Sequence, residues 1–346
     1  MRPSTRGAAE RPSPYAVVLL VLAVGTADAS GGTWEHRKNE HGQPDLQGTW
    51  DFGTKTPFQR PAELGEKRSY TEQEAMDLEK EAREQNLKMD APVDLSKDAP
   101  VAGRPVGEEA DTGSMDRRTD LTRVNGEYRT SIIIDPPTGR IPKREGFADY
   151  FARLAAMNIR PTDGPEALDT PTRCIQPLPV PSIFPMVWSA LLQIVQTKDH
   201  VVLHTEMFHD ARIVRLNGTH PNHGARAWMG DSIGHFEGNA LVVHTINFRP
   251  EQSYAAIMPM SEDFELTERF SRVSKDEIVY SFTVVDPQAY TRPFTGERTL
   301  KRAGPRDRIL EFACHEGNYA MTGILAGARK EEEEAARKVQ SISEKR

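Results

Sequence analysis

The second half of the chain contains eight short segments in which apolar and polar residues alternate, with turn-forming residues between them. Because successive side chains of a β-strand point to opposite faces, this period of two predicts strands with one buried face. The connections are short and contain no helical segment, which favours antiparallel neighbours over βαβ units. The expected strands cover residues 192–197, 200–207, 211–216, 240–248, 264–273, 277–285, 290–301 and 309–313.

A mainly β fold follows from this pattern. Closing the sheet removes its exposed edges, so we expect an antiparallel barrel, lipocalin-like or related, with a β-sandwich as the alternative. Pairs of turn-forming residues support the strand boundaries, because they favour the backbone conformations of tight hairpins. These pairs are Asn217-Gly218, Gly238-Asn239, Lys275-Asp276 and Gly304-Pro305.

The first residues have the features of a signal peptide, which we assign to residues 1–29. Three arginines precede the apolar run 16–25, and Ala27-Asp28-Ala29 supplies small residues where a signal peptidase would cleave. The apolar run is short for a membrane span, which needs about 20 apolar residues. An uncleaved anchor is the alternative interpretation. We therefore expect a periplasmic or secreted protein.

The mature chain divides into three parts. Residues 30–125 are rich in glycine, proline and polar residues and predict an irregular N-terminal arm. This arm contains one helix near residues 71–88, where Thr71 and Glu74 form a capping box. Residues 126–328 form the expected barrel domain. Residues 329–346 are highly charged and predict a helical tail.

Composition limits the classes of partner. The formal net charge is −7, the isoelectric point is about 5.9 and the basic residues are scattered, which argues against nucleic acid. The mean hydropathy is −0.59 and no second long apolar run exists, so we expect no membrane span in the mature chain. The expected partner is a small-molecule ligand or substrate.

Only two cysteines are present, Cys174 and Cys314. In an oxidising compartment an even pair predicts a disulfide. The alternative is a nucleophilic cysteine, since His315 and Glu316 directly follow Cys314. A thiolate nucleophile is poorly suited to an oxidising compartment, which favours the disulfide.

Seven of the ten histidines lie between residues 200 and 244. Histidine titrates near neutral pH, so this region is the first place to look for acid–base chemistry. His209 and Asp210 are expected where one strand turns into the next, with Arg212 on the returning strand. Together they supply a base, an acid and a cation that can hold an oxyanion. The alternative is a structural salt bridge between Asp210 and Arg212 beside a turn histidine.

Histidine is also the commonest metal ligand, which gives a second interpretation of this region. His204 and Glu206 share one strand face, and with His209 they could hold zinc if His223 or His244 supplied a fourth ligand. The spacing matches none of the helix-borne zinc motifs. We expect no cofactor and keep zinc as the alternative.

The segment Gly230–Gly234 has the G-x-S-x-G pattern of a nucleophile elbow, with Ser232 at its centre. That motif requires a strand before it and a helix after it. Here a hairpin follows, so we interpret the pattern as a glycine-rich loop. His235 and Glu237 flank the next turn and would face a ligand if this loop lines the barrel mouth.

The chain has a dense polar stretch at Cys314-His315-Glu316-Gly317-Asn318-Tyr319. His315 could serve as a general base oriented by Glu316. The expected disulfide would bring Arg173 beside this stretch. The alternative is that the bridged cysteine and its neighbours only fix the C-terminal segment. The substrate-binding residues that we expect are Arg173, Glu206, His235, Glu237 and Tyr319.

Seven short motifs are distributed along most of the mature chain, and their combination is specific although each is weak alone. They are Pro44–Trp50, Asp135–Pro142, Arg173-Cys174, Gln193–Gln196, His209–Ile213, Gly230–Gly238 and Ala313–Tyr319. This combination resembles a family of exported bacterial β-rich proteins whose function is undescribed. The resemblance implies an exported, single-domain β protein and transfers no activity. The proline-rich, apolar stretch 178–190 departs from the glycine-containing loop of that family.

Taken together, these features predict an exported, cofactor-independent enzyme that acts by acid–base chemistry on a small, largely apolar organic molecule. The reaction would be that of a lyase, isomerase, cyclase or hydrolase. The alternatives are a non-catalytic carrier on the same barrel and a metal-dependent hydrolase. The expected catalytic residues are His209, Asp210, Arg212, His315 and Glu316.

Overall fold

The structure is a computed structural model that describes residues 34–89, 118–184, 190–221, 224–252 and 257–344. The chain separates into two units, Met1–Trp34 and Glu35–Arg346, and every element below belongs to the second. The expected signal peptide, residues 1–29, lies outside the described residues.

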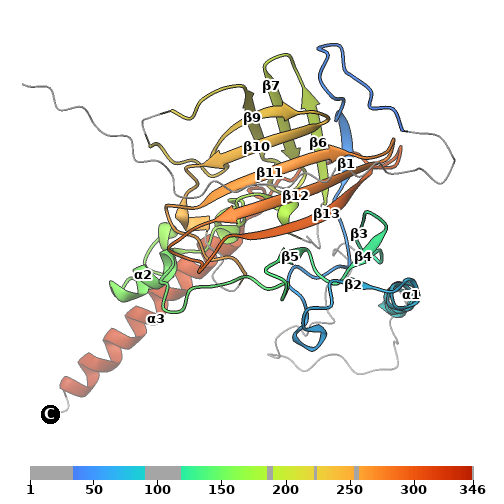
Figure 1. The fold of residues 1–346 in the computed structure, drawn as a ribbon. Helices are drawn as coiled ribbons and strands as arrows, with labels where there is room; N and C mark the ends of the chain where they lie inside the picture. Colours follow the sequence, from blue (N-terminus) through green and yellow to red (C-terminus); the bar gives the residue numbers. More distant parts are fainter. Residues whose placement is uncertain (1–33, 90–117, 185–189, 222–223, 253–256, 345–346) are drawn as a thin grey trace, which may run out of the picture. The chain divides into compact units, whose positions relative to one another are not determined.

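Nine strands close into a β-barrel, so the prediction of a mainly β barrel fold is confirmed (Figure 1). Around the barrel the order is β1-β6-β7-β8-β9-β10-β11-β12-β13, and β13 pairs back to β1 through Trp50 and Arg302. The tenth strand, β5 (Ile133–Asp135), pairs with the beginning of β13. The barrel strands are β1 (Gly48–Asp51), β6 (Leu191–Gln196), β7 (His200–Thr205), β8 (Ala211–Leu216), β9 (Asp231–Glu237), β10 (Ala240–Ile246), β11 (Glu265–Arg272), β12 (Glu277–Val285) and β13 (Phe294–Arg302).

One strand pair departs from the antiparallel expectation. Strands β8 and β9 run parallel, with Val214 opposite Ser232. The expected hairpin at Asn217-Gly218 is therefore wrong: the described residues of this connection, 217–221 and 224–230, instead lead from the end of β8 back to the start of β9. The expected strand at 309–313 does not form either, because the backbone N–H of Leu310 donates to the side chain of Glu206 rather than to a neighbouring strand.

Smaller elements surround the barrel. Helix α1 (Glu72–Met89) occupies the position expected for residues 71–88, and the Thr71 hydroxyl accepts from the Glu74 N–H at 3.2 Å. A small sheet contains β2 (Ser69–Tyr70), β4 (Glu127–Arg129) and β3 (Arg123–Val124). The other helices are α2 (Tyr150–Ala156), α3 (Tyr319–Ser343), η1 (Ala62–Leu64), η3 (Pro165–Ala167), η4 (Pro171–Arg173), η5 (Pro181–Ile183), η6 (Met207–His209) and η7 (Pro250–Gln252). In the described part of the chain, no helix is long and apolar enough to span a membrane.

Alternation along the strands directs large side chains into the barrel. Phe270, Tyr280, Phe282 and Phe294 are at most 1% exposed and belong to one apolar core. Residues 178–184 pack into the same core, where the guanidinium of Arg298 donates to the carbonyls of Ser182 and Phe184. The barrel interior is thus filled by side chains and by this inserted segment.

The strand pairings place two sets of loops at opposite ends of the barrel. The end of β7, the start of β8, the start of β9 and the end of β10 lie together. We call this the η6 end, because η6 connects β7 to β8 there. The turn at residues 238–239 between β9 and β10 lies at the other end, which we call the opposite end.

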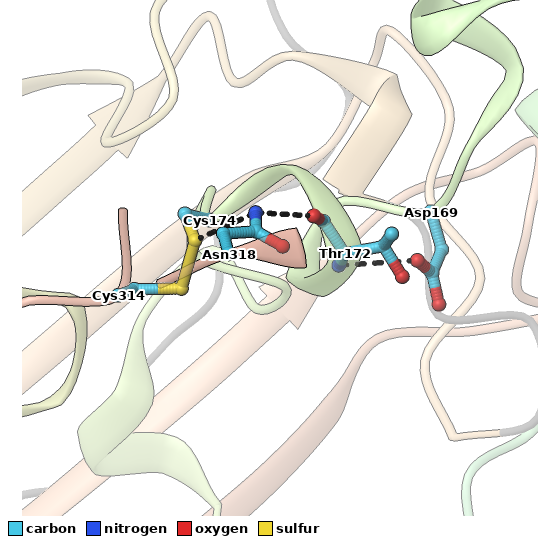
Figure 2. Close-up of a disulfide and its surroundings, with 5 residues drawn as sticks. All are labelled: Asp169, Thr172, Cys174, Cys314 and Asn318. Carbon is cyan, nitrogen blue, oxygen red and sulfur yellow. Dashed lines mark hydrogen bonds between the residues drawn. A yellow bond between two sulfur atoms is a disulfide. The ribbon is translucent and has the colours of Figure 1, made fainter. Parts of the chain in front are cut away.

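A disulfide ties the C-terminal segment to the loop before the barrel, so the predicted pairing of the cysteines is confirmed. Cys174 and Cys314 are bonded, with a Cα–Cα distance of 5.6 Å. Figure 2 shows Asn318 beside this bridge, where its side-chain amide donates to the Thr172 carbonyl at 3.0 Å and to the Cys174 sulfur at 3.3 Å. The bridge and this amide together fix the start of α3 against η4.

Candidate functional site

The turn around η6 gathers several of the residues expected from the histidine-rich segment. His204 and His209 meet edge to face, with ring centroids 4.6 Å apart. Glu206 is 8% exposed, and its Oε1 accepts from the Leu310 N–H at 3.0 Å. The segment before Cys314 therefore packs against this turn, which brings the two predicted regions to the same end of the barrel.

Burial shifts the protonation of two groups at this turn. Burial lowers the pKa of His204, and the positive charge of the nearby His209 lowers it further. Burial raises the pKa of the Asp210 carboxyl, while the charge of His209 acts in the opposite direction. His209 itself is exposed, so the turn contains acid–base groups without enclosing a substrate.

The raised pKa of Asp210 predicts how stability changes with pH. Folding penalises the ionised carboxylate, and this penalty is complete above the folded-state pKa and disappears below the ordinary value near 3.9. Asp210→Asn should therefore stabilise the protein at pH 7 and have almost no effect at pH 3. Urea unfolding at both pH values measures the difference, and a stabilisation of equal size at both would contradict it.

The residues after the disulfide do not form the expected base and orienting partner. His315 and Glu316 are exposed, and Tyr319 is 83% exposed. Within the described residues no hydrogen bond or ion pair joins the side chains of His315 and Glu316. The bridge brings the backbone of Arg173 close to this segment, as expected. The Arg173 guanidinium, however, lies over the ring of Trp228, with its Cζ atom 5.9 Å from the ring centroid.

Arg212 points into the barrel rather than toward the turn. Its guanidinium forms a buried ion pair with Glu268 of β11, with Nη2 donating to Oε1 at 2.9 Å. The Thr245 hydroxyl accepts from Arg212 at 3.1 Å, and the Tyr280 hydroxyl donates to Glu268 at 2.8 Å. The alternative of a salt bridge between Asp210 and Arg212 is therefore wrong, and Arg212 does not lie beside His209 as the expected oxyanion partner, because Glu268 pairs with it inside the barrel.

Ser232 and the pair His235 and Glu237, which the sequence also singled out, lie away from the η6 turn. The Ser232 hydroxyl faces the barrel interior and shares a hydrogen bond of 2.9 Å with Thr245, so it is not an exposed nucleophile. His235 and Glu237 lie at the opposite end, where Glu237 pairs with Arg269 at 2.7 Å and with His235 at 3.0 Å. Arg269, followed by His235, lowers the pKa of Glu237. These two residues are far along β9 from the η6 end.

A hydrogen-bonded chain of acid–base groups does form, on the outer face of β8–β11. Arg215 donates to both carboxylate oxygens of Asp231, at 2.8 and 2.9 Å. Asp231 Oδ1 lies 2.6 Å from His220 Nδ1, and His220 Nε2 lies 3.0 Å from His244 Nδ1. His244 Nε2 lies 3.7 Å from the Glu265 carboxylate. We call these five residues the imidazole relay.

The strand pattern explains how the relay assembles. His244 lies between Val243 and Thr245, which are buried in the barrel, so alternation directs it outward. Asp231 begins β9 and pairs with Ile246, and the parallel crossover 217–230 returns His220 to the same outer face. The relay is therefore a consequence of the crossover between β8 and β9.

Proton positions in the relay follow from the charge of Asp231. Arg215, followed by His220, lowers the pKa of Asp231, so this carboxylate is ionised and can only accept. His220 Nδ1 must then carry a proton, and when the imidazole ring is neutral its Nε2 is an acceptor. His244 Nδ1 donates to that acceptor, and His244 Nε2 is left with a free lone pair. These tautomers are assigned from the hydrogen-bond network.

The relay was not predicted from the sequence. His220 and His244 were counted in the histidine-rich segment, but Asp231 was considered only as part of a glycine-rich loop. Asp231 is 11 residues from His220 in sequence, and His220 is 24 residues from His244. The one available signal was His244 itself, a polar residue at the outward position of an apolar strand.

The side chains of His204, Glu206 and His209 do not form the zinc site considered as an alternative. In the regions that the structure describes, no group of three or more histidine, cysteine, aspartate or glutamate side chains is arranged to hold a metal ion. Glu206, expected beside His204 and His209, uses Oε1 to accept from a backbone N–H. His223, an alternative fourth ligand, lies outside the described residues.

Comparison of the chain with protein-family models, curated proteins and solved structures gave no match. The resemblance to an exported β-rich family therefore stays a prediction.

Proposed function

We propose that this protein is an exported enzyme that acts by acid–base chemistry on a small organic molecule, with His244 as the general base. The observation that carries the proposal is the unbroken contact from Asp231 through His220 to His244. In many enzymes a carboxylate orients the histidine that acts as the base. Here the imidazole of His220 lies between the carboxylate and the base. Export is supported by the features of residues 1–29 and by the disulfide, which persists in oxidising compartments.

The relay gives each group one role. The side chain of His244 is 38% exposed, so a substrate can approach Nε2 from solvent. When Nε2 takes a proton from a substrate carbon or hydroxyl, the new positive charge is stabilised by Glu265 and by the Nδ1–H bond to His220. His220 in turn donates from Nδ1 to Asp231. His220 and Asp231 act as positioning residues and do not touch the substrate.

This arrangement favours proton abstraction without a cofactor, as in isomerases and lyases. A hydrogen-bonded base contributes about 10²–10⁴-fold to a rate. His244→Ala should therefore lower turnover by that factor for any substrate found by screening wild-type protein against small ketones, esters and hydroxy acids. His235→Ala is the matched control, because His235 is an exposed histidine of the neighbouring strand that contacts Glu237.

The tautomers provide a test that needs no substrate. Long-range ¹H–¹⁵N spectra should show both His220 and His244 protonated at Nδ1 when neutral. Asp231→Asn should abolish that preference at His220 because the amide no longer requires a donor there. If wild-type His220 is protonated at Nε2, the relay cannot direct protons as proposed and His244 loses its assignment as the base.

A further inference from the structure

A cleft of about 710 Å³ lies between α2 and η7, apart from the residues of the imidazole relay. This volume falls within the roughly 300–1,000 Å³ of small-molecule sites. Its charged lining consists of Arg153, Arg226, Arg249, Glu251 and Glu262. We call it the arginine cleft. None of these residues was singled out by the sequence motifs.

The arginines of the cleft exceed its carboxylates. Arg153 lies 3.7 Å from Glu262 and Arg249 lies 3.6 Å from Glu251, both longer than a hydrogen bond. Arg226 donates only to backbone, to the carbonyls of Phe248 at 3.2 Å and Glu262 at 2.9 Å. Its charge therefore has no carboxylate partner among the described residues, and the cleft attracts an anion.

One guanidinium is held in a fixed orientation. Arg249 stacks on the ring of Trp228, with its Cζ atom 4.6 Å from the centroid, and Arg173 approaches the same ring at 5.9 Å. Stacking fixes the plane of the guanidinium and leaves its edge for hydrogen bonds. A planar fork of donors matches the two oxygens of a carboxylate.

The cleft also contains an acceptor that lacks a donor. Glu251 Oε2 is buried and has no hydrogen-bond partner. A buried acceptor without a donor destabilises the folded protein, and more so when the acceptor is charged. A hydroxyl or ammonium group of a bound molecule would satisfy this oxygen once the Glu251 side chain, which is 20% exposed, turns toward the cleft.

The remaining wall of the cleft is apolar. Leu154 and Met157 of α2 and Pro250 of η7 line it. Met157 is 62% exposed, which is high for a large apolar side chain. A ligand with a hydrocarbon part would cover this surface and gain about 25 cal/mol for each Å² buried.

We propose that the arginine cleft binds a small hydroxycarboxylate with an apolar tail. Its carboxylate pairs with Arg249 and Arg226, its hydroxyl donates to Glu251 Oε2, and its tail covers Leu154 and Met157. This inference does not depend on the imidazole relay.

Calorimetric titration tests the proposal with three ten-carbon probes, 3-hydroxydecanoate, decanoate and decan-1-ol, at low ionic strength. Wild-type protein should bind 3-hydroxydecanoate at least about tenfold more tightly than either of the others, since each lost charge-assisted hydrogen bond is worth about 1.5–3 kcal/mol. Arg249→Ala should weaken binding of both acids about tenfold or more. The matched control is Arg269→Ala, an arginine at the opposite end that pairs with Glu237.

Glu251→Gln should change the binding of the two acids by different amounts. Without the carboxylate, decanoate should bind more tightly because repulsion is lost, and the advantage of 3-hydroxydecanoate should shrink. Two results would overturn the proposal: wild-type protein binding 3-hydroxydecanoate no better than decan-1-ol, or Arg249→Ala and Arg269→Ala having equal effects. Neither result bears on His244, because no relay residue lines the cleft.

Discussion

Glu268→Ala is expected to lower the free energy of unfolding by about 3–5 kcal/mol, the typical cost of breaking a buried ion pair from one side. Arg212 is 4% exposed and Glu268 is fully buried, so the substitution leaves a guanidinium charge inside the barrel. The Tyr280 hydroxyl, which donates to Glu268 at 2.8 Å, loses its acceptor as well. Urea unfolding followed by circular dichroism measures the change.

The double variant Arg212→Met/Glu268→Leu separates the charge from the packing. Two apolar residues of similar volume remove both charges, and such replacements of buried pairs are often neutral or stabilising. The double variant should therefore be more stable than Glu268→Ala. Glu237→Ala, which breaks the exposed pair with Arg269, should cost at most about 1 kcal/mol. If Glu268→Ala lowers the free energy of unfolding no more than Glu237→Ala does, the Arg212–Glu268 pair is not buried and unscreened as described.

The same ion pair shows why part of the fold was predictable and part was not. The alternation of apolar residues along β10–β12 is local, so the sequence alone indicated strands and a barrel. Burying Arg212 depends on Glu268, 56 residues later in the chain, and no local pattern announces that pairing. An arginine on a strand was therefore interpreted as part of a turn site, although it points into the barrel.

Long-range topology also decided how the barrel closes. β1 lies in the N-terminal arm, where the local pattern of residues 46–52 is compatible with one strand but does not indicate that this strand closes the barrel between β6 and β13. The parallel pairing of β8 and β9 was missed because Asn217-Gly218 is typical of a hairpin, whereas here Asn217 has φ 54° and begins a crossover. Turn residues indicate that the chain changes direction, and they do not say which strand it meets next.

The candidate site shows the same division between local and distant information. The sequence singled out the η6 turn and the segment around Cys314 separately, and the contact of Leu310 with Glu206 brings them to one end of the barrel. The sequence did not predict which side chains would touch. His209 and His315 are exposed, whereas His220 and Asp231 meet only because the crossover 217–230 returns to the outer face.

The disulfide gives the second large expected effect. In the chain-entropy model, removing a bridge across 140 residues lowers the free energy of unfolding by about 4–5 kcal/mol. We expect the variant Cys174→Ser/Cys314→Ser to lose stability toward this value. Unfolding in urea, compared with that of oxidised wild-type protein, measures the loss.

The loss should begin at the C-terminal segment, because few other contacts hold it. Besides the bridge, Leu310 donates to Glu206, Phe312 packs on Phe208, and Asn318 donates to the Thr172 carbonyl. In α3, Arg329 donates to the Thr162 carbonyl and Glu332 pairs with Arg160. Limited proteolysis of the serine variant should therefore cleave near residues 303–318 before it cleaves the barrel strands. Wild-type protein treated with a reductant is the matched control and should behave like the variant. If the oxidised protein and the serine variant unfold at the same urea concentration, the bridge does not stabilise the folded chain, and the contacts of Asn318 and α3 suffice to hold the segment in place.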